Sequence, residues 1–180
     1  RAAARMRKTG NPLRADVLST TQISYRSPTR SQSFDLLVFG GSQGAQIFST
    51  VVPEAVALLP ENKRKDLRLV QQVSKDHMAD VLNTYGEMKV SSEIRDFFDD
   101  MPRRLRHAHL VICRGGASTI SEICALGVPS IIVPLPGSLD QDQANNARDL
   151  AATGAAELIL QKQFNAEDLA DLLNKWLDDR

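Results

Sequence analysis

The sequence is poor in the residues that usually mark a disulfide-rich or metal-binding protein. It has only two cysteines and three histidines. Cys113 and Cys124 lie in or beside apolar segments, so we expect both to be reduced core thiols, as in a cytoplasmic protein. The histidines do not have the spacing of a ligand set, and no metal site is predicted.

An excess of one charge and a long apolar run are also missing. The 22 basic residues are balanced by 22 acidic ones, which argues against a general nucleic-acid binder. No stretch of about eighteen apolar residues occurs, so no membrane-spanning helix is expected, and no signal peptide is visible. The chain opens with "RAAARMRKTGNPLR" and no initiator methionine, and we expect it to be a piece of a longer protein.

What the sequence does contain is an alternation of strand and helix patterns. Hydrophobic residues make up 42% of the chain, enough for a core. Short β-rich runs alternate about six times with segments of helical spacing. This predicts an α/β fold: a Rossmann-like parallel sheet with helices on both faces. Residues 1–34 are expected to be a connector with a short helix near 15–18, and residues 35–180 a domain.

The expected elements follow from the same patterns. Strands are predicted at 36–39, 67–73, within 88–97, and at 108–114, 129–134 and 155–160. Helices are predicted at 45–59, 74–83, about 100–107, 117–127, 142–154 and 165–177. We expect N-caps at Ser74, at Asp99 or Asp100, and at Asn165.

Three loops rich in glycine or proline lie at carboxyl ends of predicted strands, where such sheets bind ligands. In the first, "GGSQGA" (40–45), backbone amides and Ser42 could approach an anion, and a tight turn explains the motif equally well. No Lys-Ser or Lys-Thr follows, so it is not a Walker loop. The glycine spacing is wrong for a nicotinamide dinucleotide, and the second strand ends in Gln71 and Gln72 rather than an acid.

The second loop opens "RGGASTISE". Its glycines, Gly115 and Gly116, remove side chains where a ligand could approach. The amides of 117–119 would begin a helix and offer a diphosphate site. Glu122 could accept hydrogen bonds from adjacent ribose hydroxyls. An alternative, left equally open, makes Ser118 a helix cap and Glu122 a surface acid.

The third loop, "PLPGSLDQDQANNA" (134–147), is rich in side-chain amides and acids. Amides suit sugar hydroxyls because each offers a donor and an acceptor; a solvated loop and helix start is the common alternative. In "FFDD" (97–100) we prefer helix capping to a metal-binding acid pair. Phe97 or Phe98 could flank a planar base.

Six motifs taken together resemble one family. The motifs are "TGNPLR", "GGSQGA", "FFDDM", "CRGGASTISE", "GVPSIIVP" and "DQDQANNA". They occur in the order expected of the MurG family of bacterial peptidoglycan N-acetylglucosaminyltransferases, which are GT-B enzymes of glycosyltransferase family 28. The resemblance covers nearly all of 9–178, and only the C-terminal, donor-binding half. It implies an inter-domain connector and the start of the donor domain at 1–34, a UDP-sugar domain at 35–180, and an N-terminal acceptor domain before Arg1.

The resemblance also implies a reaction. The family transfers N-acetylglucosamine from UDP-GlcNAc to lipid I (undecaprenyl-pyrophosphoryl-MurNAc-pentapeptide), giving lipid II with inversion, peripherally on the cytoplasmic side of the inner membrane. The resemblance implies no cofactor and no nucleic-acid partner. It implies no metal either, because helix amides and Ser42 can stabilise the leaving UDP. The general base is expected in the N-terminal half. No catalytic residue is therefore nominated, and the chain alone is expected to be inactive or nearly so.

Contacts to UDP-GlcNAc follow from the resemblance position by position. Arg14 would contact the nucleotide-sugar, Ser42 a phosphate, and Phe98, through its backbone, the uracil. Glu122 would hold the ribose, while Gln143 and Asn146 would read the sugar hydroxyls. The helix start would hold the diphosphate and sugar through Ala117, Ser118, Thr119, Ile120 and Ser121.

Other interpretations stay open. The chain could be a separate donor-binding subunit of a two-chain UDP-GlcNAc transferase, or a UDP-GlcNAc epimerase-like domain with the same architecture. An NAD-dependent dehydrogenase is the weakest of these, because the ribose-binding acid is missing from the end of the second strand.

Overall fold

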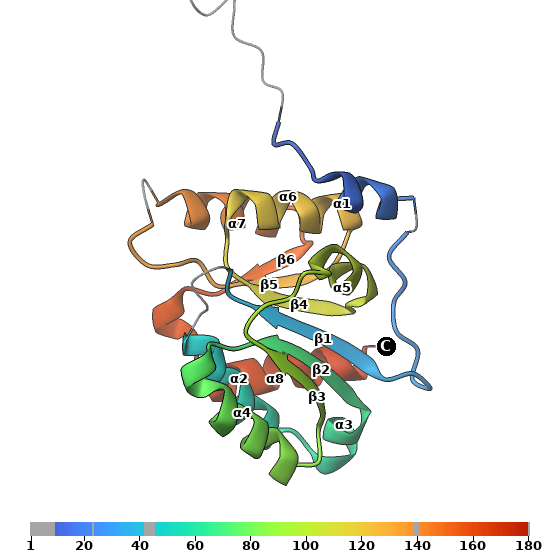
Figure 1. Cartoon of the computed structure of the whole chain (residues 1–180), viewed down its shortest axis with the longest axis vertical. Coiled ribbons are helices and arrows are strands. Elements are labelled where there is room, and N and C mark those ends of the chain that lie inside the picture. Colours follow the sequence, from blue (N-terminus) through green and yellow to red (C-terminus); the bar gives the residue numbers. More distant parts are fainter. Residues whose placement is uncertain (1–9, 23, 42–45, 139–140, 180) are drawn as a thin grey trace, which may run out of the picture.

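Six parallel strands of the described residues form one sheet (Figure 1). The computed structural model describes residues 10–22, 24–41, 46–138 and 141–179. The strands are β1 (Phe34–Phe39), β2 (Leu67–Gln72), β3 (Ser91–Arg95), β4 (Leu110–Cys113), β5 (Ser130–Ile132) and β6 (Ala156–Leu158). Their order, β3-β2-β1-β4-β5-β6, confirms the predicted Rossmann-like sheet. The direction of winding changes between β1 and β4, which is where ligands bind in sheets of this kind.

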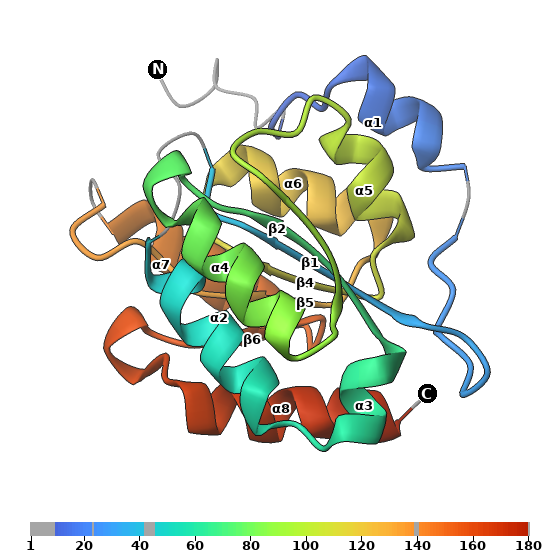
Figure 2. The same cartoon turned by 60° about the horizontal axis from the view of Figure 1, so that its bottom comes forward.

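Helices cover both faces of the sheet (Figures 1 and 2). On one face lie α2 (Gln46–Leu58), α4 (Lys75–Glu87) and α8 (Ala166–Asp178). On the other lie α1 (Ala15–Thr20), α5 (Met101–His107), α6 (Ala117–Leu126) and α7 (Asp142–Ala151). Two short elements were not predicted, α3 (Glu61–Asp66) and the 3₁₀ turn Gln161–Gln163; neither contains a buried residue that would give an apolar pattern. Within the described ranges, no helix has the length and hydrophobicity to cross a bilayer.

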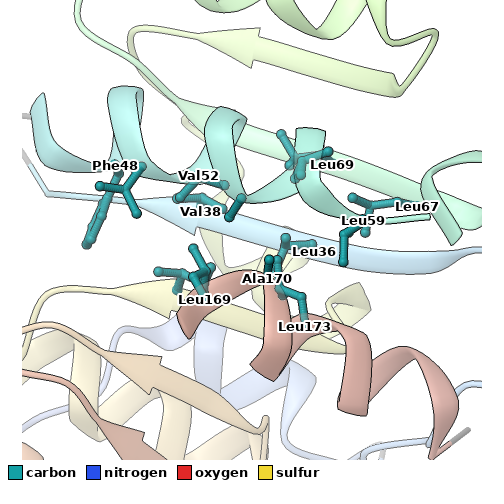
Figure 3. Packing of buried hydrophobic residues seen from close by; sticks show 14 of the residues in the cluster. Leu36, Val38, Phe48, Val52, Leu59, Leu67, Leu69, Leu169, Ala170 and Leu173 are labelled. Atoms are coloured by element: carbon teal, nitrogen blue, oxygen red, sulfur yellow. The ribbon is translucent and has the colours of Figure 1, made fainter. Parts of the chain in front are cut away.

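The larger core lies between the sheet and the layer of α2, α4 and α8 (Figure 3). Its buried side chains include Leu36, Val38, Phe48, Val52, Leu69, Leu169, Ala170 and Leu173. Each buried leucine contributes about 1.5–3 kcal/mol by leaving water. The N-cap predicted for the last helix is confirmed, since the Asn165 side chain accepts a hydrogen bond from the Asp168 amide at 2.9 Å. This packing fixes α2 against the sheet.

Two predicted N-caps are confirmed in position only, and one predicted core thiol is wrong. Ser74 and Asp100 are the N-cap residues of α4 and α5, but neither side chain makes a capping hydrogen bond within the described part of the chain. The Asp100 carboxylate instead accepts from Arg104 Nε at 2.5 Å, and a charged donor competes well with a backbone amide. Cys113 is buried, but Cys124 is exposed because it falls outside the apolar stripe of α6.

A buried hydrogen-bonded chain joins α4, β2 and α2. The Tyr85 hydroxyl donates to Gln71 Oε1 at 2.7 Å, and Gln71 Nε2 donates to the Phe48 carbonyl at 2.9 Å. All three side chains are fully buried. Burial holds the pKa of Tyr85 well above its usual value, so its hydroxyl remains a donor. The side-chain amide of Gln71 therefore has a structural role in the core.

Replacing Tyr85 by phenylalanine is expected to lower the free energy of unfolding by about 1–3 kcal/mol, because Gln71 Oε1 would lose its donor in the core. Urea denaturation measures the change. The control is Tyr25→Phe, which removes a half-buried hydroxyl that donates to the His109 carbonyl at 3.1 Å. That loss should be smaller, about 0.5–1.5 kcal/mol. Equal losses would show that the buried chain has no special weight.

Candidate functional site

The start of α6 is open to an anion. Gly116 is its N-cap, with extended backbone (φ −63°, ψ 142°), and the Ile120 amide donates to the Gly116 carbonyl at 2.9 Å. The amides of Ala117, Ser118 and Thr119 therefore have no acceptor within the helix. Ala117 and Ser118 are exposed, and the first turn has no acid. The alternative that made Ser118 the cap is wrong, and the helix N-terminus keeps its partial positive charge available.

Gly115 lets two loops touch. A Cβ built on this residue would lie 2.4 Å from the backbone carbonyl oxygen of Gln143. Asn146 Nδ2 donates to the Gly115 carbonyl at 3.2 Å, and Gln143 Oε1 accepts from the Leu135 amide at 3.0 Å. The two residues predicted to read the sugar are thus brought to the loop after β4. Among the described residues, Gln143 Nε2 and Asn146 Oδ1 make no hydrogen bond and remain for a ligand.

Glu122 is a buried, paired acid. It is 8% exposed, and its two carboxylate oxygens accept from Arg14 Nε at 2.9 Å and Arg14 Nη2 at 3.1 Å. The Arg14 side chain is itself 53% exposed. A buried carboxylate needs such a partner, because desolvation otherwise penalises its charge. The surface-acid interpretation is therefore wrong, and two residues predicted to bind one ligand lie in direct contact.

The segment before β1 is docked on α6. Asn11 Nδ2 donates to Ser121 Oγ at 3.2 Å, and Ser121 Oγ donates to the Ala117 carbonyl at 2.8 Å. Val17 of α1 is fully buried against α5 and α6. The Ile120 side chain packs on the same core, which leaves only its backbone for a ligand. Asn11 was missed as a site residue, although the signal was present in "TGNPLR".

Phe98 stands apart from this cluster. Ser42 lies outside the described residues. Phe98 is 4% exposed, and the guanidinium carbons of Arg104 and Arg95 lie 4.1 and 6.0 Å from its ring centroid. Its ring is therefore covered and cannot flank a base, whereas Phe97 is 68% exposed. Only the Phe98 backbone, at the carboxyl end of β3, could serve a ligand.

Arg114 is a residue of this edge that the sequence analysis did not nominate. Its Nη1 donates to the carbonyls of Val133 at 3.0 Å and Pro134 at 3.2 Å. Its guanidinium carbon lies 5.1 Å from the Phe48 ring centroid. Burial lowers the pKa of Arg114, but a guanidinium stays charged. Arg114 therefore joins the loops after β4 and β5 to α2. In the sequence, the feature that could have identified it is a cation directly after a buried strand.

Together these groups form a cationic edge with one buried acid. The N-terminus of α6, Arg14 and Arg114 favour an anion, while Glu122 and the amides of the third loop suit hydroxyl groups. The part of the chain that the structure describes has no group of three or more His, Cys, Asp or Glu side chains that could hold a metal ion. The arrangement is suited to a ligand that carries both phosphate and sugar.

Comparison with known proteins agrees with this chemistry. Residues 35–180 match the glycosyltransferase family 28 C-terminal domain. A UDP-N-acetylglucosamine–N-acetylmuramyl-(pentapeptide) pyrophosphoryl-undecaprenol N-acetylglucosamine transferase of Bartonella tribocorum is 49% identical over 167 residues, which are 93% of this chain and 44% of the relative. The crystal structure of Acinetobacter baumannii MurG has a TM-score of 0.72 at 27% identity, covering 86% of this chain and 48% of its own.

A further structural neighbour shows the fold alone. It is a putative UDP-N-acetylglucosamine 2-epimerase from Listeria monocytogenes, with a TM-score of 0.57 at 19% identity, covering 90% of this chain and 42% of its own. The chain spans less than half the length of the curated relatives it matches. The family match and the identity to full-length relatives lead to one conclusion: the chain belongs to glycosyltransferase family 28, of which it carries the C-terminal domain.

Proposed function

We propose that this chain is the UDP-GlcNAc-binding half of an inverting glycosyltransferase that transfers N-acetylglucosamine to lipid I and forms lipid II. The observation that carries the proposal is the open start of α6 beside the buried Glu122. The relatives' name supplies a donor and an acceptor of the same chemistry. The whole enzyme would work peripherally on the cytoplasmic face of the membrane.

The leaving UDP would be stabilised by fixed donors. The amides of Ala117–Thr119 point out of the helix towards the loop, where the diphosphate would lie, and need no reorganisation. Arg14 adds a half-exposed cation. Its guanidinium donates to both carboxylate oxygens of Glu122. A ribose would share or displace that contact, and the released Arg14 would then neutralise diphosphate.

The sugar would be read by the third loop. Gln143 and Asn146 each use one amide atom to hold the loops together and keep the other for a hydroxyl. The acceptor contacts and the general base are assigned to the N-terminal domain of the full-length enzyme, and residues 1–34 to the connector that leads from it. This chain alone would bind donor and make no lipid II.

Calorimetric titration of the chain with UDP-GlcNAc, UDP-glucose and NAD tests the proposal. We expect saturable binding of both UDP compounds, a preference for UDP-GlcNAc, and no binding of NAD. Gln143→Ala should weaken binding of both UDP-sugars by roughly 5- to 10-fold, the value of one hydrogen bond to a sugar hydroxyl. The matched control is Gln163→Ala, on an exposed turn, which should change nothing. Binding of NAD without UDP compounds, or lipid II synthesis by the chain alone, would contradict the proposal.

A further inference from the structure

A second hollow lies at the opposite edge of the sheet from the candidate site. It has a volume of about 720 Å³ and opens where β1 and β4 begin. Its walls come from the segment between α1 and β1, from the last turns of α5, and from the first residues of β1 and β2. In Figure 1 that segment is the blue stretch that descends from α1 to β1. The volume is that of an ordinary small-molecule pocket.

The wall made by this segment is pinned to the domain. The Tyr25 hydroxyl donates to the His109 carbonyl at 3.1 Å, and Arg106 Nη2 donates to the Ser24 carbonyl at 2.8 Å. The Asp35 amide donates to His109 Nδ1 at 2.8 Å. Three contacts therefore tie the segment, the end of α5 and the start of β1 together, and the hollow is a defined feature of the fold.

The hollow carries an excess of positive charge. Its lining includes four arginines and one acid, Asp35. Asp35 is occupied by Arg68, through bonds of 2.5 and 2.9 Å. Within the described residues, Arg26, Arg103 and Arg106 form no ion pair, and the enclosed Nε of Arg106 has no acceptor. The charges of Arg26 and Arg106 thus remain uncompensated here, although the chain as a whole is neutral. Arg103 adds a third positive charge, which also faces the adjacent hollow and acts on Asp100.

The adjacent hollow beneath α5 shows the contrast. It has about 500 Å³ and is lined by three acids and three arginines, so its charges balance. There Arg104 donates to Glu93 at 2.7 Å and to Asp100 at 2.5 Å. These hydrogen bonds hold the pKa values of Glu93 and Asp100 below their usual range. Arg103, Arg68 and Asp35 line both hollows, whereas Arg26 and Arg106, which form no ion pair within the described residues, line only the hollow at the amino edge.

The C-terminus of α5 does not account for this excess. Arg106 and His107 do lie in its last turn, where a helix favours cations. A helix end is equivalent to only about half a negative charge, and α5 is a single short helix. Three guanidinium groups around one concavity, with hydroxyls of Tyr25 and Ser27 beside them, match the oxygens of a phosphoryl group, which arginine binds through paired hydrogen bonds.

We propose that this hollow is an anion site that binds a phosphate-bearing ligand, either the headgroup of an anionic lipid or a soluble phosphorylated molecule. The site is separate from the candidate donor site, because one lies at the amino ends of the strands and the other at the carboxyl ends. It does not depend on the function proposed above. The two sites have no residue in common, so each can be altered by substitution without changing the other.

The test uses the whole chain at low ionic strength, where such contacts are strongest. Binding is measured to vesicles of phosphatidylcholine with and without phosphatidylglycerol, and to sodium pyrophosphate by calorimetry. The variants are Arg103→Gln, whose side chain makes no hydrogen bond within the described residues, and Arg103→Gln/Arg106→Gln. The control, Lys162→Gln/Lys175→Gln, removes the same charge from exposed lysines on the other face. Circular dichroism checks the fold of every variant.

We expect each arginine to contribute about fivefold in affinity, and the double variant to lose about 10- to 25-fold, while the control keeps wild-type binding. If the variants lose affinity only for vesicles that contain phosphatidylglycerol, the ligand is a lipid headgroup. If they lose only one component of pyrophosphate binding, the ligand is a soluble phosphorylated molecule. Pyrophosphate bound at α6 would persist in all variants. If Arg103→Gln and the folded double variant bind both probes as the control does, the proposal is overturned. UDP-GlcNAc binding should be unchanged throughout.

Discussion

Replacing Glu122 by alanine is expected to weaken UDP binding by roughly 30- to 150-fold. The carboxylate would lose its hydrogen bonds to the ribose hydroxyls, at a cost of about 2–3 kcal/mol. The variant also leaves Arg14 without the partner that it binds at 2.9 and 3.1 Å in the ligand-free chain. Calorimetric titration with UDP measures the loss, and Glu54→Ala, an exposed acid of α2, is the control.

A change on the ligand separates ribose recognition from a structural effect. Wild type should bind UDP about tenfold more tightly than 2′-deoxy-UDP, because one hydroxyl is missing. If Glu122 holds the ribose, Glu122→Ala should bind the two ligands almost equally. If the acid serves only to anchor Arg14, the variant should bind both more weakly and still prefer UDP. The second pattern would remove Glu122 from the ribose subsite.

Replacing Gly115 by alanine is the second large effect that we expect. The new Cβ would lie 2.4 Å from the Gln143 backbone carbonyl oxygen. The clashing atoms belong to the backbone and cannot move aside as the end of a flexible side chain could. The loops after β4 and β5 would have to separate. Overpacking of this kind costs about 1–3 kcal/mol in the free energy of unfolding. Because Gln143 would move with its loop, affinity for UDP-GlcNAc should fall as well.

The neighbouring glycine provides the control. A Cβ on Gly116 would have Thr119 Oγ1 as its nearest neighbour at 3.9 Å, an ordinary contact. Its backbone (φ −63°, ψ 142°) suits alanine, so Gly116→Ala should cost less than about 1 kcal/mol, mostly for a poorer N-cap. Urea denaturation compares the free energies of unfolding of Gly115→Ala and Gly116→Ala, and titration with UDP-GlcNAc compares their affinities. Similar stability for both would show that the loops are not held together by this close approach.

The sheet could be predicted because its signals are local. β1, β4 and β5 are short apolar runs, and the longer helices α2, α6 and α8 each bury several apolar residues. β3 (SSEIR) is polar, and its strand was placed only within 88–97. For α6 the prediction is accurate to the residue, since Gly127 ends the helix with φ +64° as a glycine can. The six polar residues of α3 have no stripe, and that helix was therefore missed. Cys124 was wrongly placed in the core because it lies in an apolar segment. An apolar neighbourhood does not show which face of a helix a residue occupies.

The candidate site was predictable in its loops and not in its contacts. Glycine pairs after buried strands indicated where a ligand would approach, and the resemblance supplied individual residues. Neither could show that Arg14 and Glu122 bind each other, since 108 residues separate them. For Asp100, local chemistry indicated a cap, and a guanidinium four residues on took its place. Long-range pairing and competition between partners decide such cases, and a single sequence carries no direct record of either.

The docking of Asn11, Arg14 and Val17 on α6 has a consequence for modular exchange. The stretch that matches the family begins at residue 35, but the buried carboxylate of Glu122 is neutralised from outside that stretch. A chimaera that began at residue 35 would keep the whole sheet except Phe34, the first residue of β1. It would still expose the surface on which Val17 packs and leave the buried Glu122 carboxylate without its counter-ion. The portable unit is therefore longer than the matched C-terminal domain, and a graft between relatives should be joined upstream of Asn11.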